Sequence, residues 1–307
     1  MSRKLISFDW AMKKILRQKA NFGILEGFLT ELLKFDVKIE EILESEANQE
    51  TEEDKFNRVD LLAKNEHDEL ILIEVQHRSE IDYFHRMLYG TSKLITEYIK
   101  RGKGYAKVKK VYSVNIVYFA LGQGEDYVYY GKTEFRGLHK NEDTLKPSQK
   151  QKDDFKIETI SDIYPEYYIL RVNKFNNIAK SSLDEWIYFL KNEEIKTAFK
   201  AKGLDRAKET LDMIKLGDKE RAIYKRREEN KMYRESLMYT AKIEGEEIGI
   251  KKGLEKGKKL EKIKIAKASL KQNIDISTIA LITGLTIDEI QEIKEKQLST
   301  EILRNTN

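Results

Sequence analysis

The stretch that decides the fold is Arg58–Gln76, RVDLLAKNEHDELILIEVQ. It predicts two short strands, Arg58–Lys64 and Leu70–Gln76, on either side of a polar turn at Asn65–Glu69. Leucine, isoleucine and valine occupy both faces of these strands, which is typical of strands buried inside a sheet. The sequence therefore predicts a hairpin at the centre of a sheet.

Polar side chains interrupt this hairpin at Asp60, Glu74 and Gln76. A hairpin symmetric about His67 places Asp60 opposite Glu74, with Cβ atoms roughly 4.5–5.5 Å apart. When two carboxylates lie at this distance and are surrounded by apolar side chains, either one of them takes up a proton or a cation binds between them. Mg²⁺ is usually held by such oxygen ligands together with waters and a substrate phosphate. The pair therefore indicates a metal site for phosphodiester chemistry; the alternative is that one carboxylate lies at a strand end in water.

Composition limits the class of protein. Of the 307 residues, 36% are charged and 40% hydrophobic, and the absence of cysteine excludes disulfides, zinc–thiolate sites and cysteine nucleophiles. The first residues contain no apolar signal-peptide segment, and no run approaches the 18 or more apolar residues of a membrane span. We therefore expect a cytoplasmic protein. The net charge of +4 permits a nucleic-acid partner without arguing for one.

Periodicity predicts a mixed α/β core. Helical spacing is expected over Phe8–Phe35, with a break near Asn21–Gly23, and over Glu80–Arg101. The remaining strands are expected at Val37–Leu43, Val111–Ala120, Tyr127–Phe135 and Ile169–Val172. The order helix, strand, hairpin, helix, strand predicts a helix that crosses over to a parallel strand.

The chain becomes highly charged and helical in pattern from Ser182 onward. Four glycines recur every four residues, at Gly245, Gly249, Gly253 and Gly257. Each costs a helix about 1 kcal/mol relative to alanine, so the repeat indicates either a small-residue face for self-association or a flexible charged linker. From Ile263 the pattern resembles a helix-turn-helix, but acidic residues on its last helix favour a folding cap or oligomerisation module over DNA binding.

Several motifs in this order resemble the Rpn family. They are RVDLL, ILIEVQ, FHRMLYG, KGYAKVKKVYSVNIV, WIYFL, the glycine-spaced repeat and IALITGLTIDEI, and they span roughly residues 5 to 295. Rpn proteins are recombination-promoting nucleases, also described as transposases, of the PD-(D/E)XK superfamily. The resemblance implies an α/β fold with a PD-(D/E)XK (restriction-endonuclease-like) core, in which helices flank a central mixed sheet, plus an α-helical C-terminal region.

The resemblance also implies site residues. Asp60 matches the motif aspartate and Glu74 the second acidic ligand, and the Val75 backbone carbonyl completes the expected metal ligands. Most PD-(D/E)XK enzymes have lysine at the position of Gln76. Rpn proteins have glutamine there, as this sequence does. An amide can orient the attacking water but has no charge to stabilise the phosphate.

The missing positive charge must come from the metal or from another residue. Arg86 matches a family arginine and is the candidate, with Lys13 a weaker one; the alternative for Arg86 is an ordinary surface or ion-pair residue. His77 points to the opposite face from Gln76 and is expected to be structural or, at most, a phosphate contact.

Together these observations predict a metal-dependent DNA endonuclease of little sequence specificity, linked to recombination or transposition, that uses Mg²⁺ or alternatively Mn²⁺. The alternative is a catalytically weak or inactive DNA-binding or assembly protein that retains the nuclease fold. The expected partners are DNA and further copies of the chain, bound through the glycine-spaced and C-terminal helices, with no membrane contact. The expected regions are a nuclease-like domain (1–180), a charged helical extension (181–240), a glycine-spaced charged helix or linker (241–262) and a small helix-turn-helix-like tail (263–307).

Overall fold

The computed structural model describes residues 5–14, 16–43, 60–99, 104–140, 142–212 and 216–305. The contacts of the chain divide it into two compact units, Met1–Gly217 and Asp218–Asn307. The division falls at Gly217 because the helices α5 (Ser182–Asn192) and α6 (Leu204–Thr210) contact α2 (Phe22–Leu33) inside the first unit. The boundaries expected at residues 180, 240 and 262 stay predictions.

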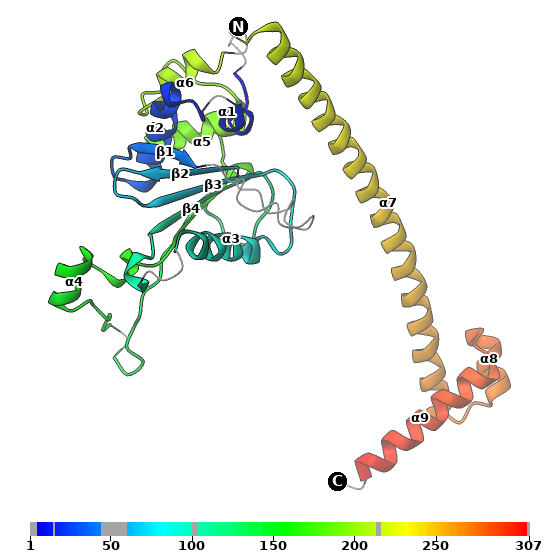
Figure 1. The fold of residues 1–307 in the computed structure, drawn as a ribbon. Coiled ribbons are helices and arrows are strands. Elements are labelled where there is room, and N and C mark those ends of the chain that lie inside the picture. Colours follow the sequence, from blue (N-terminus) through cyan, green and yellow to red (C-terminus); the bar gives the residue numbers. More distant parts are fainter. Residues whose placement is uncertain are drawn as a thin grey trace. The chain divides into compact units, whose positions relative to one another are not determined.

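The first unit is built on a six-stranded mixed sheet in the order β1-β2-β3-β4-β6-β5 (Figure 1). Its strands are β1 (Ile39–Leu43), β2 (Leu61–Asn65), β3 (Leu70–Gln76), β4 (Val111–Val117), β5 (Val128–Gly131) and β6 (Glu166–Arg171). The central strands β3, β4 and β6 run parallel, and the pairs β1–β2, β2–β3 and β5–β6 are antiparallel. The prediction of a mixed sheet flanked by helices is confirmed.

The hairpin of β2 and β3 has the predicted register. Leu61 pairs with Ile73 and Leu62 with Leu72, so the strands are symmetric about His67. The buried Asn65 side chain fixes the turn, because its Oδ1 accepts hydrogen bonds from the backbone nitrogens of His67 at 3.1 Å and of Glu69 at 2.9 Å. The first two residues of the predicted strand, 58 and 59, lie outside the described residues.

The helix α3 (Tyr83–Tyr98) covers one face of the sheet and connects β3 to β4 (Figure 1). Its buried residues recur every three or four positions, which places them on the stripe that faces the sheet; they are Tyr83, Met87, Thr91 and Leu94. Because β3 and β4 are parallel, the predicted crossover helix is confirmed.

The helices α1 (Phe8–Lys14), α2, α5 and α6 lie together on the other face (Figure 1). The predicted break near Asn21 is confirmed, since α1 ends at Lys14 and α2 begins at Phe22. Aromatic rings hold this layer together: the Phe8 ring lies 5.4 Å from that of Phe28 and 6.1 Å from that of Trp186.

The start of the described chain is tied to the end of the first unit by backbone hydrogen bonds. The amide nitrogen of Leu5 donates to the Glu193 carbonyl at 3.2 Å, and that of Ile6 donates to the Leu211 carbonyl at 2.9 Å. Residues separated by about 200 positions therefore meet along one edge of this helical layer.

The strand predicted to run to Phe135 is shorter in the structure. β5 ends at Gly131, which pairs with Tyr167, and its partner β6 begins one residue earlier, at Glu166. The prediction beyond Gly131 is therefore wrong, because β6 offers at most one more ladder partner, Glu166, and cannot pair with a strand that runs to Phe135.

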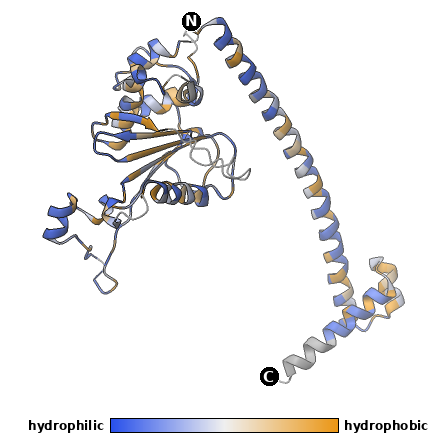
Figure 2. Cartoon of the chain, viewed as in Figure 1, coloured by the Kyte–Doolittle hydropathy of each residue, from blue (hydrophilic) through white to orange (hydrophobic). Residues whose placement is uncertain are grey.

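The second unit is helical, with α7 (Asp218–Lys271), α8 (Ile276–Thr283) and α9 (Ile287–Asn305). Much of α7 is hydrophilic (Figure 2). It contains the four spaced glycines, and a Cβ added at any of them would meet no atom of the described residues within 4 Å. A small cluster joins the three helices through Ala266, Ile279, Leu285, Ile290 and Ile293.

The turn between α8 and α9 has the local structure that the sequence predicts. Gly284 ends α8 with a φ of +63°, and Thr286 and Glu289 exchange the hydrogen bonds of a capping box. None of the helices in the described ranges is long and apolar enough to cross a bilayer.

Candidate active site

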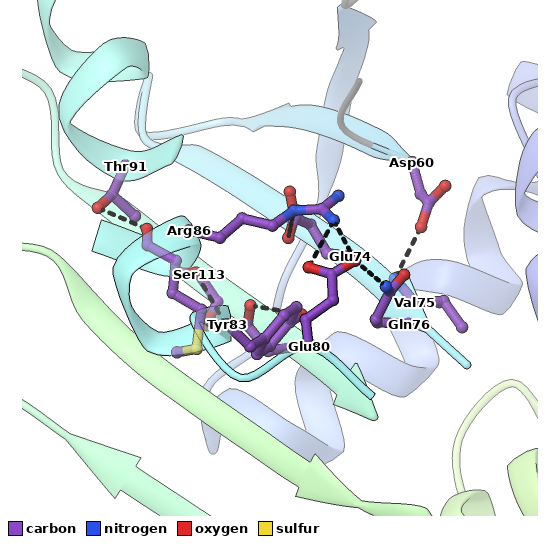
Figure 3. Close-up of polar contacts among 11 residues, drawn as sticks. Asp60, Glu74, Val75, Gln76, Glu80, Tyr83, Arg86, Thr91 and Ser113 are labelled. Carbon is purple, nitrogen blue, oxygen red and sulfur yellow. Dashed lines mark hydrogen bonds and ion pairs between the residues drawn. The ribbon is translucent and has the colours of Figure 1, made fainter. Parts of the chain in front are cut away.

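The predicted acidic residues Asp60 and Glu74 both lie near the carboxyl end of β3 (Figure 3). Glu74 and Val75 belong to β3, Gln76 is its last residue, and Asp60 directly precedes β2. The carboxyl ends of parallel strands are a common place for ligand sites in α/β proteins. The topology therefore places these groups where an active site is expected.

Asp60 is held against β3 although it precedes the first ladder pair. Its Oδ2 accepts a hydrogen bond of 2.7 Å from the backbone nitrogen of Val75 (Figure 3). Its backbone carbonyl accepts a bond of 3.0 Å from Arg17 Nη2. These two contacts fix Asp60 beside the Glu74–Gln76 segment.

Glu74 is a buried acid, with 8% of the residue exposed. Burial raises the pKa of its carboxyl group to about 7, against the opposing charge of Arg86 and with the support of the negative charges of Asp60 and Glu80. Its Oε2 is buried and makes no hydrogen bond with any described residue. Binding a proton or a cation would strongly stabilise this buried carboxylate, because either one neutralises its charge.

A buried polar network lies behind Glu74. In the parallel ladder Glu74 pairs with Asn115 of β4. The Tyr83 hydroxyl donates to Asn115 Oδ1 at 3.2 Å, and Asn115 Nδ2 donates to Ser113 Oγ at 2.9 Å. Sequence reasoning missed these residues; the available signal was an asparagine inside the otherwise buried strand VYSVNIV.

Glu80 is the other residue that sequence reasoning missed. It lies between β3 and α3, and its carboxylate accepts a hydrogen bond from Gln76 Nε2. The same carboxylate accepts bonds of 3.0 and 3.1 Å from Arg86 Nη1 (Figure 3). Arg86 Nε lies 3.9 Å from Glu74 Oε2, an ion-pair distance that is too long for a hydrogen bond. Glu80 therefore joins Gln76 to Arg86 directly beside Glu74.

The two remaining predicted phosphate contacts are not brought to this cluster by any described interaction. The His77 ring stacks on that of Tyr118, with centroids 4.2 Å apart, and His77 Nε2 lies 3.7 Å from Asp9 Oδ2. These neighbours agree with the expected side-chain alternation between Gln76 and His77. Lys13 lies in α1, and its side chain is outside the described part of the chain.

Side chains alone do not complete a metal cage here. Among the residues that the structure describes, no three or more His, Asp or Glu side chains gather closely enough to hold an ion. The oxygen donors that the sequence predicted are the Asp60 and Glu74 carboxylates and the Val75 carbonyl. Such a small set suits Mg²⁺, which usually keeps several waters and takes one or two carboxylates.

Comparison with known proteins decides the family. A family model described as a PD-(D/E)XK nuclease family transposase matches residues 6–241. The chain belongs to this family. No curated protein and no solved structure matches the chain. Membership of the PD-(D/E)XK nuclease family confirms the resemblance found in the sequence and the predicted fold class. The matched range contains the whole sheet and ends inside α7, so α8 and α9 lie outside it.

Proposed function

We propose that this family member is a metal-dependent DNA endonuclease that hydrolyses phosphodiester bonds with little sequence specificity during recombination or transposition. The observation that carries the proposal is the position of the Asp60 carboxylate beside Glu74 at the carboxyl end of β3, where Asp60 Oδ2 accepts a hydrogen bond from the Val75 backbone nitrogen. One Glu74 oxygen is buried there without a hydrogen bond. A cation between the two carboxylates would satisfy that oxygen and offset their mutual repulsion.

Asp60, Glu74 and the Val75 carbonyl would hold the ion, with Mg²⁺ the first choice and Mn²⁺ the alternative. All three offer the hard oxygen atoms that these cations prefer. A bound divalent ion lowers the pKa of a coordinated water and polarises the scissile phosphate. The ladder between β3 and β4 and the hydrogen bond from Val75 to Asp60 keep these donors in place.

Gln76 and Arg86 have separate roles in this proposal. The Gln76 carbonyl oxygen accepts a hydrogen bond from the attacking water and orients it. Arg86 contributes the positive charge that lysine supplies in most PD-(D/E)XK enzymes, and its guanidinium suits a phosphate oxygen. No side chain is assigned to base recognition, so we expect contacts with the DNA backbone to dominate binding.

The test is nicking of supercoiled plasmid by the full-length protein in Mg²⁺ and in EDTA. Asp60→Asn and Glu74→Gln should each slow nicking at least about a hundredfold, because loss of a ligand removes several kcal/mol of transition-state stabilisation. Asp82→Asn is the matched control: Asp82 is exposed, and its side chain does not cap α3. Variants at Asp60 and Glu74 that nick as fast as the Asp82 control would show that the site is wrong.

A second candidate function follows from the contacts of Glu80. The Gln76 amide and the Arg86 guanidinium are both bound to Glu80, which favours the alternative of a weakly active or inactive DNA-binding protein if neither is released. Such a protein would bind DNA with an affinity that falls steeply as salt rises, yet would not cleave it in Mg²⁺ or Mn²⁺. Measured cleavage would exclude this alternative.

We further propose that the chain self-associates through α7 and the helices that follow it. The four glycines have open space around them in the described structure, and each costs helix stability that close approach of another helix would offset. Gly249→Leu together with Gly253→Leu should lower the molecular mass measured by light scattering. An unchanged mass would exclude this surface.

A further inference from the structure

We infer that Glu80 is a positioning residue that holds the Arg86 guanidinium away from Glu74 and so keeps Glu74 available to a divalent cation. This inference rests on the proposed function, because it concerns the same metal site. Glu80 has no place in the ligand set of Asp60, Glu74 and Val75. Its assigned role is exerted through Arg86 and Gln76.

The first argument comes from two polar atoms that face each other without bonding. Arg86 Nε and Glu74 Oε2 are both buried, and neither has a hydrogen-bond partner among the described residues. They carry opposite charges and lie 3.9 Å apart. Closing this gap by about 1 Å would satisfy both atoms, so another contact must hold the guanidinium back.

Glu80 supplies that contact. Both of its carboxylate oxygens accept hydrogen bonds from Arg86 Nη1, at 3.0 and 3.1 Å. Charge-assisted bonds of this kind are among the stronger polar contacts in proteins. Without them, Glu74 would be the nearest ion-pair partner of Arg86 among the residues that the structure describes. The guanidinium would then close on Glu74 and compete with the metal for the same oxygen.

The second argument concerns the orientation of the Gln76 amide. A carboxylate can only accept hydrogen bonds, so the amide nitrogen must face Glu80 and the amide oxygen must face away. No described residue donates a hydrogen bond to that oxygen. Glu80 therefore presents Gln76 to its surroundings as an acceptor, which is the end of the amide that can orient a water.

The third argument is the charge balance of the cluster. With their carboxylates ionised, Asp60, Glu74 and Glu80 contribute −3, and Arg86 contributes +1. The resulting charge of −2 is the charge that one divalent cation neutralises. Glu80 thus offsets the positive charge of the arginine, and this additive part of its effect is what the Asp82→Asn control measures.

The experiment is a double-mutant cycle on Mn²⁺ binding, measured by calorimetry or electron paramagnetic resonance on the full chain at pH 8.5. Glu80→Gln is made in the parent and in an Arg86→Gln background. Asp82→Asn, made in both, measures the effect of removing one nearby negative charge. Fluorescence of the two tryptophans, Trp10 and Trp186, which are both buried, checks that every variant folds.

In the parent, Glu80→Gln should weaken Mn²⁺ binding about tenfold, the usual scale for a residue that supports a metal ligand. In the Arg86→Gln background, Glu80→Gln should weaken Mn²⁺ binding at most about twofold, and by no more than Asp82→Asn weakens it in that background. Equal factors in the two backgrounds would mean that Glu80 acts only as a charge and would overturn the inference.

Nicking assays on the same preparations separate the inference from the proposed function. If the variants show the expected coupling in Mn²⁺ binding but the parent leaves plasmid intact, the proposed activity is refuted and the role of Glu80 is supported. A parent that nicks plasmid but shows no coupling would refute the role of Glu80 alone. A parent that binds no Mn²⁺ would overturn both.

Discussion

Replacing Glu74 by glutamine should change how the stability of the first unit depends on pH. The folded protein raises the pKa of this acid from 4.5 to about 7, because the carboxyl group is buried. A raised pKa means that the folded state binds the proton more tightly than the unfolded state. The stabilisation from this group is therefore fully present below about pH 4.5 and is lost as pH rises through 7.

The difference between these pKa values corresponds to about 3 kcal/mol. The parent should lose this amount between pH 5 and pH 8.5, whereas Glu74→Gln, which has no titrating group there, should not. The variant should match the parent near pH 5 and exceed it at pH 8.5. For a unit of this size, about 3 kcal/mol corresponds to roughly 6–12 °C in melting temperature.

Thermal unfolding in EDTA, followed by tryptophan fluorescence, measures this difference. The chain has two tryptophans, Trp10 and Trp186, and both are buried in the first unit, so the signal reports that unit alone. Glu66→Gln, in the exposed turn of the hairpin, is the control for the loss of one carboxylate. A difference between Glu74→Gln and the parent that stays constant from pH 5 to 8.5 would refute the reasoning.

Three further substitutions test the packing, the buried charge and the helix cap. Gly27→Ala should lower stability by about 1–3 kcal/mol or more in urea unfolding, since the added Cβ would lie 2.2 Å from the Lys202 carbonyl oxygen; an unchanged midpoint would contradict this close approach. Lys110→Met should cost about 3 kcal/mol at neutral pH, the lower end for a buried ion pair, by leaving the partly buried Glu166 carboxylate without its 2.8 Å partner, and recovery in the Glu166→Gln double variant is the check. Asp275→Ala should remove about 1 kcal/mol by deleting the N-cap of α8, which would appear as faster amide hydrogen exchange in that helix and not in α3.

The hairpin could be predicted because its determinants are local. Apolar strands on both sides of a short polar turn leave few possible registers, and the predicted symmetry about His67 is the one that the β2–β3 ladder has. The Asn65 side chain then fixes the turn through bonds to residues only two and four positions away. Sequence patterns capture such short-range bonds well.

Glu80 could not be found in the same way. It lies between a strand and a helix, where neither period applies, and its bonds to Gln76 and Arg86 depend on how the chain turns from β3 into α3. The Tyr83–Asn115 bond joins residues 32 positions apart, and its geometry exists only once β4 pairs with β3. The end of β5 was misjudged for a related reason, because strand length depends on the partner strand as well as on the sequence of the strand itself.

The bonds that tie Leu5 and Ile6 to Glu193 and Leu211 have a consequence for synthesis. About 200 residues separate these partners, which at 5–20 residues per second take a ribosome roughly 10–40 s to add. For most of that interval α1 and α2 lack the aromatic side chains of α5 that pack against them in the finished unit. Completion of the helical layer must therefore wait until residue 211 has left the ribosome, and a chain whose synthesis stops earlier would expose apolar surface to chaperones and proteases.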